Sequence, residues 1–180
     1  MSERILYTIG HSDHPIEALI ALLQDAGSDL LVDVRAQPYS RRHPQYRREA
    51  LAAALGQVAI GYRWEGRALG GRRQVLAQSP HRALAEPFRA YADHMSSTEY
   101  REAVERVLEL AHGHRLALMC AEALPEACHR SLIADDLTRR GLRVVHILRD
   151  AQTRSHELSA SARWDGKWLI YDRGTQGELI

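Results

Sequence analysis

The chain has 180 residues, 45% hydrophobic and 26% charged, a composition that excludes disordered and fibrous proteins and predicts one globular domain over residues 1–180. The formal net charge of +1 gives no general argument for binding nucleic acid or a membrane surface. Two cysteines are too few for a disulfide scaffold; with no apolar run of roughly 20 residues and no secretory signal, we expect a cytoplasmic protein with reduced thiols and no membrane partner.

The first part of the chain alternates strand and helix signals. Residues 5–9 are rich in β-formers, and apolar residues then recur at helical spacing between Pro15 and Gly27. In chain order the sequence predicts a strand over 5–9, a helix from Pro15 to Gly27, a buried strand over 30–34, a loop over 35–46, a helix over 47–55 and a strand over 58–64. The loop contains two prolines and no periodicity, and loops of this length in compact domains commonly contribute to function.

The remainder of the chain repeats this alternation. In chain order the sequence predicts an irregular segment over 66–87, helices over 88–94 and 98–111, a strand over 115–119, a helix over 125–140, a strand over 143–148 and a hairpin over 163–172. The hairpin is indicated by Asp165 and Gly166 between two apolar runs. We therefore predict an α/β fold, a three-layer sandwich with a mostly parallel sheet and a C-terminal β-hairpin that adds an antiparallel edge or covers the site.

Polar residues follow the predicted strands at the points where the strands end. Ligands of open parallel sheets bind just beyond the carboxyl ends of the strands. The predicted catalytic residues at these ends are His11, Asp33, Cys120 and Glu122. The predicted substrate-binding residues are Arg35, Ser40, Arg41, Cys128, His129 and Arg130. We expect His11, Arg35, Cys120 and Arg130 in particular to line one pocket.

Cys120 follows an apolar strand, where a side chain is held rigidly. The thiol is a candidate nucleophile or redox centre if a cation or a helix N-terminus lowers its pKa, and a small buried hydrophobic residue otherwise. Cys128, His129 and Arg130 are expected in the first turns of a helix beginning near Pro125, where free N–H groups attract anions. His129 has a second interpretation, as a core residue with one ring nitrogen bonded to the backbone.

Asp33 interrupts an apolar strand, so its carboxylate needs a partner. Arg35 stands two residues later and projects from the same face of an extended strand. The pair either closes the strand end as a simple ion pair, or has a functional role in which Asp33 orients Arg35 or acts as an acid or base.

No cofactor and no metal is predicted. The sequence contains neither a P-loop nor a dinucleotide-binding fingerprint after a strand. Zinc ligation by Cys120, Glu122, Cys128 and His129 is disfavoured, because seven residues separate the two cysteines, unlike the short spacing of zinc knuckles. Adjacent helical residues also point about 100° apart, which separates Cys128 from His129.

Four motifs together resemble a known bacterial family. TIGHS at 8–12, VDVRAQPYSRRHP at 32–44, LGG at 69–71 and LMCAEALPEACHR at 118–130 resemble the domain of unknown function 488 family. The likeness covers about residues 7–148 and leaves a hairpin extension over about 156–180. It implies an α/β fold and a site at the matching residues His11, Ser12, Asp33, Arg35, Pro38, Ser40, Arg41, Cys120, Glu122, Cys128, His129 and Arg130. His14 departs from the family, which often has a small hydroxyl residue at the start of this helix.

These residue types predict an enzyme acting on an anionic substrate that carries a phosphate or a carboxylate. The anion would be held by Arg35, Arg41 and Arg130. Cys120 would be the nucleophile or redox centre, and Glu122 or His11 would transfer protons.

Two alternatives use the same surface. The arginine-rich region over 35–73 could bind nucleic acid, with phosphates on the arginines and bases stacked on aromatic rings. A GC-rich genome would also favour arginine over lysine, and Lys167 is the only lysine. The other alternative is a non-catalytic module that binds a ligand in the same crevice.

Overall fold

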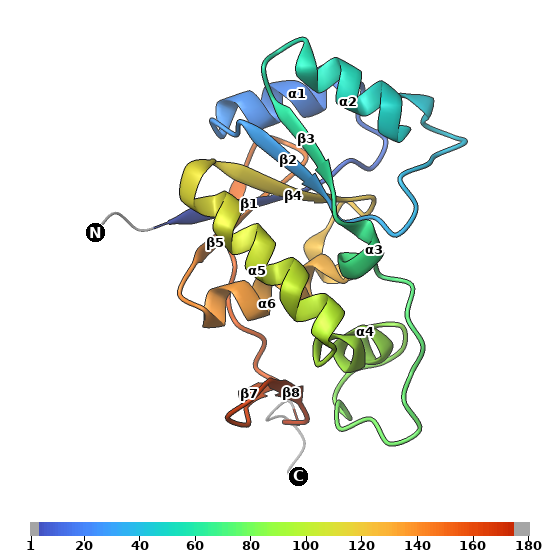
Figure 1. Cartoon of the computed structure of the whole chain (residues 1–180), viewed down its shortest axis with the longest axis vertical. Coiled ribbons are helices and arrows are strands. Elements are labelled where there is room, and N and C mark those ends of the chain that lie inside the picture. The colour runs from blue at the N-terminus through green and yellow to red at the C-terminus, as the bar shows by residue number, and fades with distance from the viewer. Residues whose placement is uncertain (1–3, 175–180) are drawn as a thin grey trace.

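The computed structural model describes residues 4–174 and contains one six-stranded sheet with the order β3-β2-β4-β1-β5-β6 (Figure 1). The strands are β1 (Ile5–Gly10), β2 (Leu30–Asp33), β3 (Gly61–Trp64), β4 (Leu116–Cys120), β5 (Arg143–Ile147) and β6 (Thr153–Ser155). All neighbouring strands pair in parallel except β6, which pairs antiparallel with β5. The predicted α/β fold with a mostly parallel sheet is confirmed.

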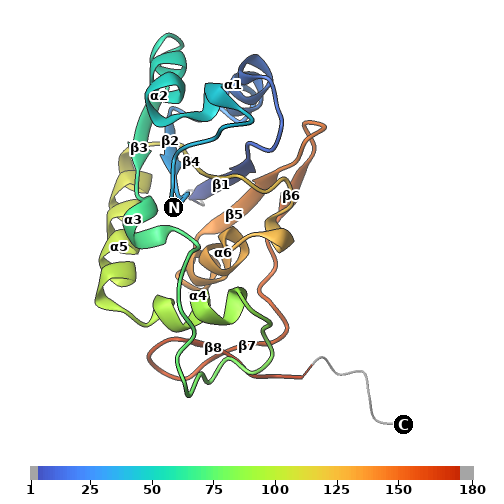
Figure 2. The same ribbon diagram turned by 90° about the vertical axis from the view of Figure 1, so that its right-hand side faces the viewer.

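Helices cover both faces of the sheet (Figures 1 and 2). On one face lie α1 (Ile16–Asp25) and α2 (Arg48–Gly56), and on the other α3 (Gly66–Leu69), α4 (Phe88–Met95), α5 (Thr98–Gly113) and α6 (Arg130–Arg139). None of the described helices is long and apolar enough to cross a bilayer.

The pleat of the strands divides the core between the two faces. Leu31 and Met119 pack with residues of α1 and α2, whereas Val32 and Cys120 pack with residues of α4, α5 and α6. Because side chains alternate along a strand, Asp33 shares the face of Leu31. The sheet therefore presents Asp33 and Cys120 on opposite faces at the same carboxyl edge.

Two helix ends follow directly from their sequences. The hydroxyl of Ser97 accepts a hydrogen bond from the amide of Tyr100 at 3.1 Å, which satisfies a free N–H at the start of α5. Beyond the end of α1, Gly27 has φ +66°, a left-handed conformation that glycine adopts without steric strain. The predicted start of α5 and stop of α1 are confirmed.

The helix predicted over 125–140 is wrong at its start. Residues 125–127 form a 3-10 turn, η2 (Pro125–Ala127), and Cys128 is then extended, with φ −139° and ψ 145°. The α-helix begins only at Arg130. Cys128 and His129 therefore precede the helix and do not lie in its first turns. The extended backbone at Cys128 places its thiol against that of Cys120.

Other differences concern short segments. The strand predicted over 58–64 begins at Gly61, because Ala59 has φ 58° and turns the chain before it. Segments predicted to be irregular contain η1 (Pro44–Tyr46) and α3, and β6 lies in a segment for which no element was predicted. These elements have three or four residues each, too few for an apolar period to be recognised.

The hairpin is confirmed as β7 (Ala162–Trp164) and β8 (Leu169–Tyr171), which pair antiparallel. Its turn includes Gly166 at φ +101°. The hairpin forms a separate two-stranded sheet, and β8 packs against α4. The antiparallel edge of the main sheet is β6, so the expectation that the hairpin supplies this edge is wrong. Residues 175–180 of the predicted extension lie outside the described residues.

Candidate functional site

A cavity of about 370 Å³ opens at the carboxyl edge of the sheet, the edge that Figure 2 faces. The predicted site residues in its wall are His11, Arg35, Ser40, Cys120, Glu122, Cys128 and His129. Asp33 lies behind Arg35, and neither Arg41 nor Arg130 is part of the wall. No residue of β7 or β8 is among those that line the cavity, so the hairpin does not cover it.

Asp33 and Arg35 form a two-pronged ion pair behind the cavity wall. The Nε and Nη2 atoms of Arg35 lie 2.9 and 2.6 Å from the two carboxylate oxygens of Asp33, and the Tyr62 hydroxyl donates to the same carboxylate at 2.7 Å. Burial and the Asp33 charge raise the pKa of Tyr62, so its hydroxyl remains a donor. Asp33 is fully buried, and these bonds supply the partners that a buried carboxylate requires. The predicted pairing is confirmed.

His11 extends this network into the cavity. Arg35 Nη1 lies 3.2 Å from His11 Nε2, and His11 Nδ1 lies 2.9 Å from the Ser12 carbonyl oxygen. The ring stacks on Tyr46 at a centroid distance of 4.2 Å. Burial, reinforced by the Arg35 charge, lowers the pKa of His11 to about 4. The neutral ring thus donates from Nδ1, accepts at Nε2 and holds the guanidinium of Arg35 in place.

Cys120 and Cys128 also belong to the cavity wall. They lie on the face of the sheet opposite to that of Asp33, and their side chains contact each other. Their Sγ atoms are 2.7 Å apart, with Cys128 as the donor. Burial raises the pKa of Cys120, but the hydrogen bond from Cys128 and the charge of Arg130 outweigh it, so the net shift is downward. The hydrogen bond to Cys120, together with burial, raises the pKa of Cys128 well above its usual value. Cys120 is therefore the more acidic thiol of the pair and Cys128 the less acidic one.

Arg130 lies beneath the loop that follows β4. Its side chain is only 1% exposed, and Nη2 lies 3.4 Å from the Ala123 carbonyl oxygen. Within the described residues, its Nε and Nη1 atoms have no hydrogen-bond partner and no carboxylate pairs with it. An arginine keeps its charge when buried, and an unpaired buried charge is strongly destabilising. The charge of Arg130 favours the deprotonated form of Cys120. The prediction that Arg130 lines the pocket is wrong, because the loop covers it.

His129 joins the two halves of the site. Its Nε2 atom lies 3.3 Å from the Val34 carbonyl oxygen and its Nδ1 atom 3.5 Å from Cys128 Sγ. This confirms the interpretation in which one ring nitrogen bonds to the backbone, and burial lowers the pKa of His129 to about 4. A Cβ atom on Gly71 would lie 2.6 Å from His129 Nδ1, so a larger residue where this loop crosses the ring would displace the ring or the loop.

The rim of the cavity differs from the prediction. The Ser40 hydroxyl accepts from the His43 amide at 3.0 Å, forming a turn in which Arg41 is exposed and outside the wall. The assignment of Arg41 to substrate binding is therefore not supported by its position. Arg72, which the sequence analysis did not select, is at the rim; its Nη1 donates to Gln37 at 3.2 Å and it has no carboxylate partner among residues 4–174. Only its position directly after LGG hinted at this role.

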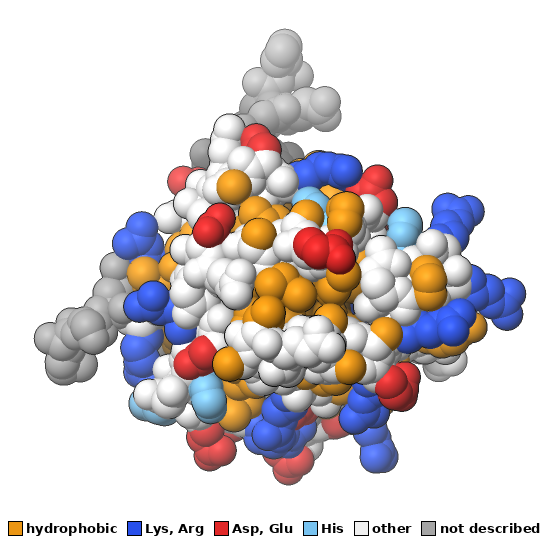
Figure 3. Space-filling model, turned by 90° about the horizontal axis from the view of Figure 1, so that it is seen from above, with side chains coloured by type: hydrophobic (Ala, Val, Ile, Leu, Met, Phe, Trp, Pro, Cys, Tyr) orange, Lys and Arg blue, Asp and Glu red, His pale blue; other side chains and the backbone are white. Residues whose placement is uncertain are grey.

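Many arginines of the 35–73 region are engaged within the protein. Arg63 donates to Glu65 at 2.7 Å, Arg47 lies over the ring of Tyr39, and Arg48 lies over the ring of Trp64. The face seen in Figure 3 carries side chains of both charges around an apolar centre. That face therefore does not present a uniform basic surface.

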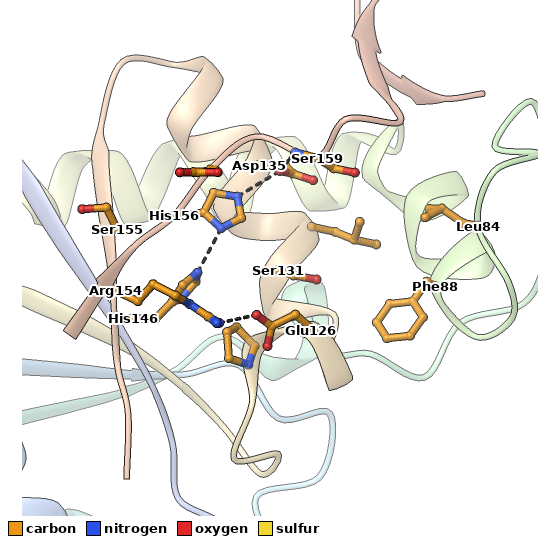
Figure 4. Close-up of a pocket in the computed structure, with 13 residues that line it drawn as sticks. Leu84, Phe88, Glu126, Ser131, Asp135, His146, Arg154, Ser155, His156 and Ser159 are labelled. Atoms are coloured by element: carbon orange, nitrogen blue, oxygen red, sulfur yellow. Dashed lines mark hydrogen bonds and ion pairs between the residues drawn. The ribbon is translucent and has the colours of Figure 1, made fainter. Parts of the chain in front are cut away.

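A second cavity, of about 540 Å³, lies between α6 and the segment after β6 and shares Phe88 with the first (Figure 4). In its wall, His146 Nε2 lies 2.9 Å from His156 Nδ1, and His156 Nε2 lies 2.9 Å from Asp135 Oδ1. The buried Thr8 hydroxyl bonds to His146 Nδ1 at 2.7 Å. Each ring nitrogen of this chain already has a protein partner, so the chain attaches the C-terminal segment to α6 and β5.

The described residues contain no group of three His, Cys, Asp or Glu side chains placed to hold a metal ion. No curated protein and no solved structure matches the sequence. A family model described as domain of unknown function DUF488 matches residues 15–137, which include Arg35, Cys120 and Cys128 of the cavity wall. Because this match spans well over half of the sequence, the chain belongs to the domain of unknown function DUF488 family.

Proposed function

We propose that the protein is an enzyme in which the Cys120 thiolate attacks a substrate carrying a phosphate or carboxylate group. One observation carries the proposal: Arg130 is a buried cation with two unpartnered donors, next to a pair of thiols and without a carboxylate partner among the described residues. Electrostatic stabilisation by a neighbouring cation is what makes a cysteine thiolate available at neutral pH. A purely structural thiol pair would not require this buried charge.

The wall of the cavity supplies the remaining roles. Arg72 at the rim is the cation that meets the anionic group of the substrate, because the charge of Arg35 is already neutralised by Asp33. His11 and Arg35 then act as a fixed hydrogen-bonding wall opposite Cys120. The cavity of about 370 Å³ is large enough for a small metabolite.

The covalent step conserves charge around Arg130. The Cys120 sulfur forms a bond to the electrophilic atom of the substrate, whose leaving group departs with the bonding electrons. The leaving group takes the proton of Cys128, which becomes a thiolate beside Arg130 in place of Cys120. Glu122, exposed on the cavity wall, accepts the proton of the water that cleaves the covalent intermediate, and Cys120 leaves as the thiolate. The proton on Glu122 then returns to Cys128, which restores the starting state.

Alkylation by two reagents of similar size tests the substrate charge. For Cys120, the ratio of the alkylation rate by anionic iodoacetate to the rate by neutral iodoacetamide should be higher than for a free thiol. The reason is that Arg72 attracts the carboxylate of iodoacetate. Arg72→Gln should abolish this preference, and Arg115→Gln should not, because Arg115 precedes β4 at the opposite edge of the sheet. Equal preferences in the parent and in Arg72→Gln would overturn the role of Arg72.

The pH dependence of iodoacetamide labelling tests the thiolate itself. The midpoint for Cys120 should lie below the value of about 8.5 for a free cysteine, and Arg130→Gln should raise it. Circular dichroism of the variant shows whether it is folded. An unchanged midpoint in a folded variant would remove Arg130 as the counter-ion, and Cys120→Ser identifies the labelled residue.

A reactive thiol pair fits a cytoplasmic location, where thiols are kept reduced. Nucleic-acid association remains the competing proposal; it requires affinity for oligonucleotides that falls steeply with salt. Absence of binding at low salt removes it.

A further inference from the structure

We propose that Cys120 and Cys128 form a reversible dithiol–disulfide couple whose oxidant is a small hydroperoxide. The couple shares the Cys120 thiolate with the proposed enzyme, but it needs neither the anionic substrate nor Arg72. It would give the protein a second activity, the reduction of a peroxide at the expense of a thiol. Three features carry the inference: the contact between the sulfurs, the unequal acidity of the two thiols, and their place in the cavity wall.

The two sulfurs are held in contact by separate parts of the fold. Cys120 is the last residue of β4, and Cys128 is the extended residue between η2 and α6. Their Sγ atoms are 2.7 Å apart and both cysteines are free. A disulfide bond of about 2.05 Å needs the sulfurs to approach by only about 0.7 Å more. The loop of seven residues between them therefore already has a shape close to that of a closed loop.

The unequal thiols assign the order of the chemistry. The Cys120 thiolate attacks one oxygen of the hydroperoxide; an S–O bond forms, the O–O bond breaks, and hydroxide or alkoxide leaves. Cys120 is thereby oxidised by two electrons to a sulfenic acid. The sulfur of Cys128 then attacks Cys120 Sγ, the S–S bond forms, and the S–O bond breaks to release water with the proton of Cys128. Two molecules of an external thiol return both cysteines to the reduced state and become a disulfide.

The cavity selects the size of the oxidant. Both cysteines belong to its wall, but their side chains are only 1% and 4% exposed. A hydroperoxide is small enough to reach Cys120 through the cavity, whereas a disulfide on the surface of another protein is not. The site therefore fits a small hydroperoxide rather than a protein partner.

The buried charge makes the disulfide easy to reduce. In the reduced state the Cys120 thiolate compensates Arg130, but a disulfide carries no charge and leaves Arg130 without a described counter-ion. Stabilisation of the thiolate state raises the reduction potential of a cysteine pair. The couple is accordingly expected to return to the dithiol in millimolar thiol, which distinguishes a working couple from a permanent structural disulfide.

Intact mass and thiol counting on the full chain test the proposal. After one equivalent of hydrogen peroxide, the parent should lose two hydrogen atoms and both alkylatable thiols, and dithiothreitol should restore both. Cys128→Ser should instead gain oxygen on Cys120, and Cys120→Ser should stay unmodified under the same treatment. In a second measurement, equilibration with a thiol–disulfide buffer, Arg130→Gln should shift the couple toward the disulfide.

The outcomes separate this inference from the proposed function. Addition of oxygen to the parent without loss of two hydrogens, persistence of both thiols, or an intermolecular disulfide would each overturn the couple. If the protein forms the disulfide but shows no preference for iodoacetate, the dithiol–disulfide couple is supported and the proposed anionic substrate is overturned. If the protein prefers iodoacetate but forms no disulfide, the anionic substrate is supported and the couple is overturned.

Discussion

At the scale of one side chain, the buried carboxylate of Asp33 depends on its partners. Replacing Arg35 by Gln leaves this carboxylate without its cation, so we expect the free energy of unfolding to fall by about 3–5 kcal/mol. Tyr62→Phe removes a single hydrogen bond to the carboxylate and should lower the free energy of unfolding by about 1–3 kcal/mol. Urea unfolding at pH 7 measures both. Exposed Arg41→Gln is the control, and a loss for Arg35→Gln no larger than the control's would contradict the network.

Buried neutral histidines make the stability depend on pH. Burial lowers the pKa of His11 and His129 to about 4 and, with help from His156, that of His146 to about 3. In the unfolded chain the value is about 6.5, so below pH 6.5 the unfolded state binds protons that the folded state does not. The histidines thus leave stability intact above pH 6.5 and reduce it progressively as the pH falls toward 4.

Urea unfolding between pH 4 and 7 checks this expectation. The free energy of unfolding should rise with pH across the range, and His146→Gln should flatten part of the slope. His112→Gln is the control, because His112 is exposed. A parent whose stability is flat from pH 4 to 7 would show that these histidines titrate normally in the folded protein.

At the scale of the element, periodicity predicted every helix of eight or more residues and the parallel strands of the sheet. It failed at Cys128, where the chain leaves a helical pattern to make a contact with Cys120, which is distant in sequence. It also missed β6, whose three residues are all exposed and therefore carry no apolar signal. Local patterns record burial along a segment, but neither a contact between distant side chains nor an exposed edge changes such a pattern.

The junction of β1 with the loop after β4 depends on a glycine. A Cβ atom on Gly10 would lie 1.8 Å from the Glu122 carbonyl oxygen, so Gly10→Ala must displace this loop. We expect a loss of about 1–3 kcal/mol in the free energy of unfolding and slower alkylation of Cys120, because the loop also covers Arg130.

Gly56→Ala is the matched control for this junction. Gly56 ends α2 and has no atom within 4 Å of an added Cβ. Alanine there should leave alkylation unchanged and raise stability by up to about 1 kcal/mol. Urea unfolding and the alkylation rate report on both variants. Equal alkylation rates in the two variants would show that the loop after β4 does not position the thiols.

At the scale of the whole molecule, the site is assembled from both faces of the sheet. Strand ends in the sequence were sufficient to place His11, Arg35 and Cys120 around one cavity. They were insufficient for Arg130 and Arg41, because the direction of a side chain beyond a strand is set by the path of the loop. That path is determined by contacts such as the approach of Gly71 to His129, which no periodicity encodes.

Asp135 connects the C-terminal hairpin to the rest of the protein. Its carboxylate accepts from His156 at 2.9 Å and from the Tyr171 hydroxyl at 3.0 Å. Asp135→Asn should lower the free energy of unfolding by about 1–3 kcal/mol and speed amide hydrogen exchange in β7 and β8, while exchange in β1 stays slow. The half-buried pair of Asp172 and Arg163 within the hairpin offers a control, since Asp172→Asn should change stability less than Asp135→Asn does. Identical exchange in parent and Asp135→Asn would contradict the connection.

The short strand β6 also bears on how copies of this protein meet one another. Without it, β5 would be the outer strand of the sheet, and the unpaired amides and carbonyls of a strand with buried Val145 and Ile147 would be open to another chain. Three exposed residues occupy that position, and Arg154 at their centre forms an ion pair with Glu126. Short, charged edge strands discourage intermolecular β-pairing, so at this edge β6 protects the sheet against aggregation.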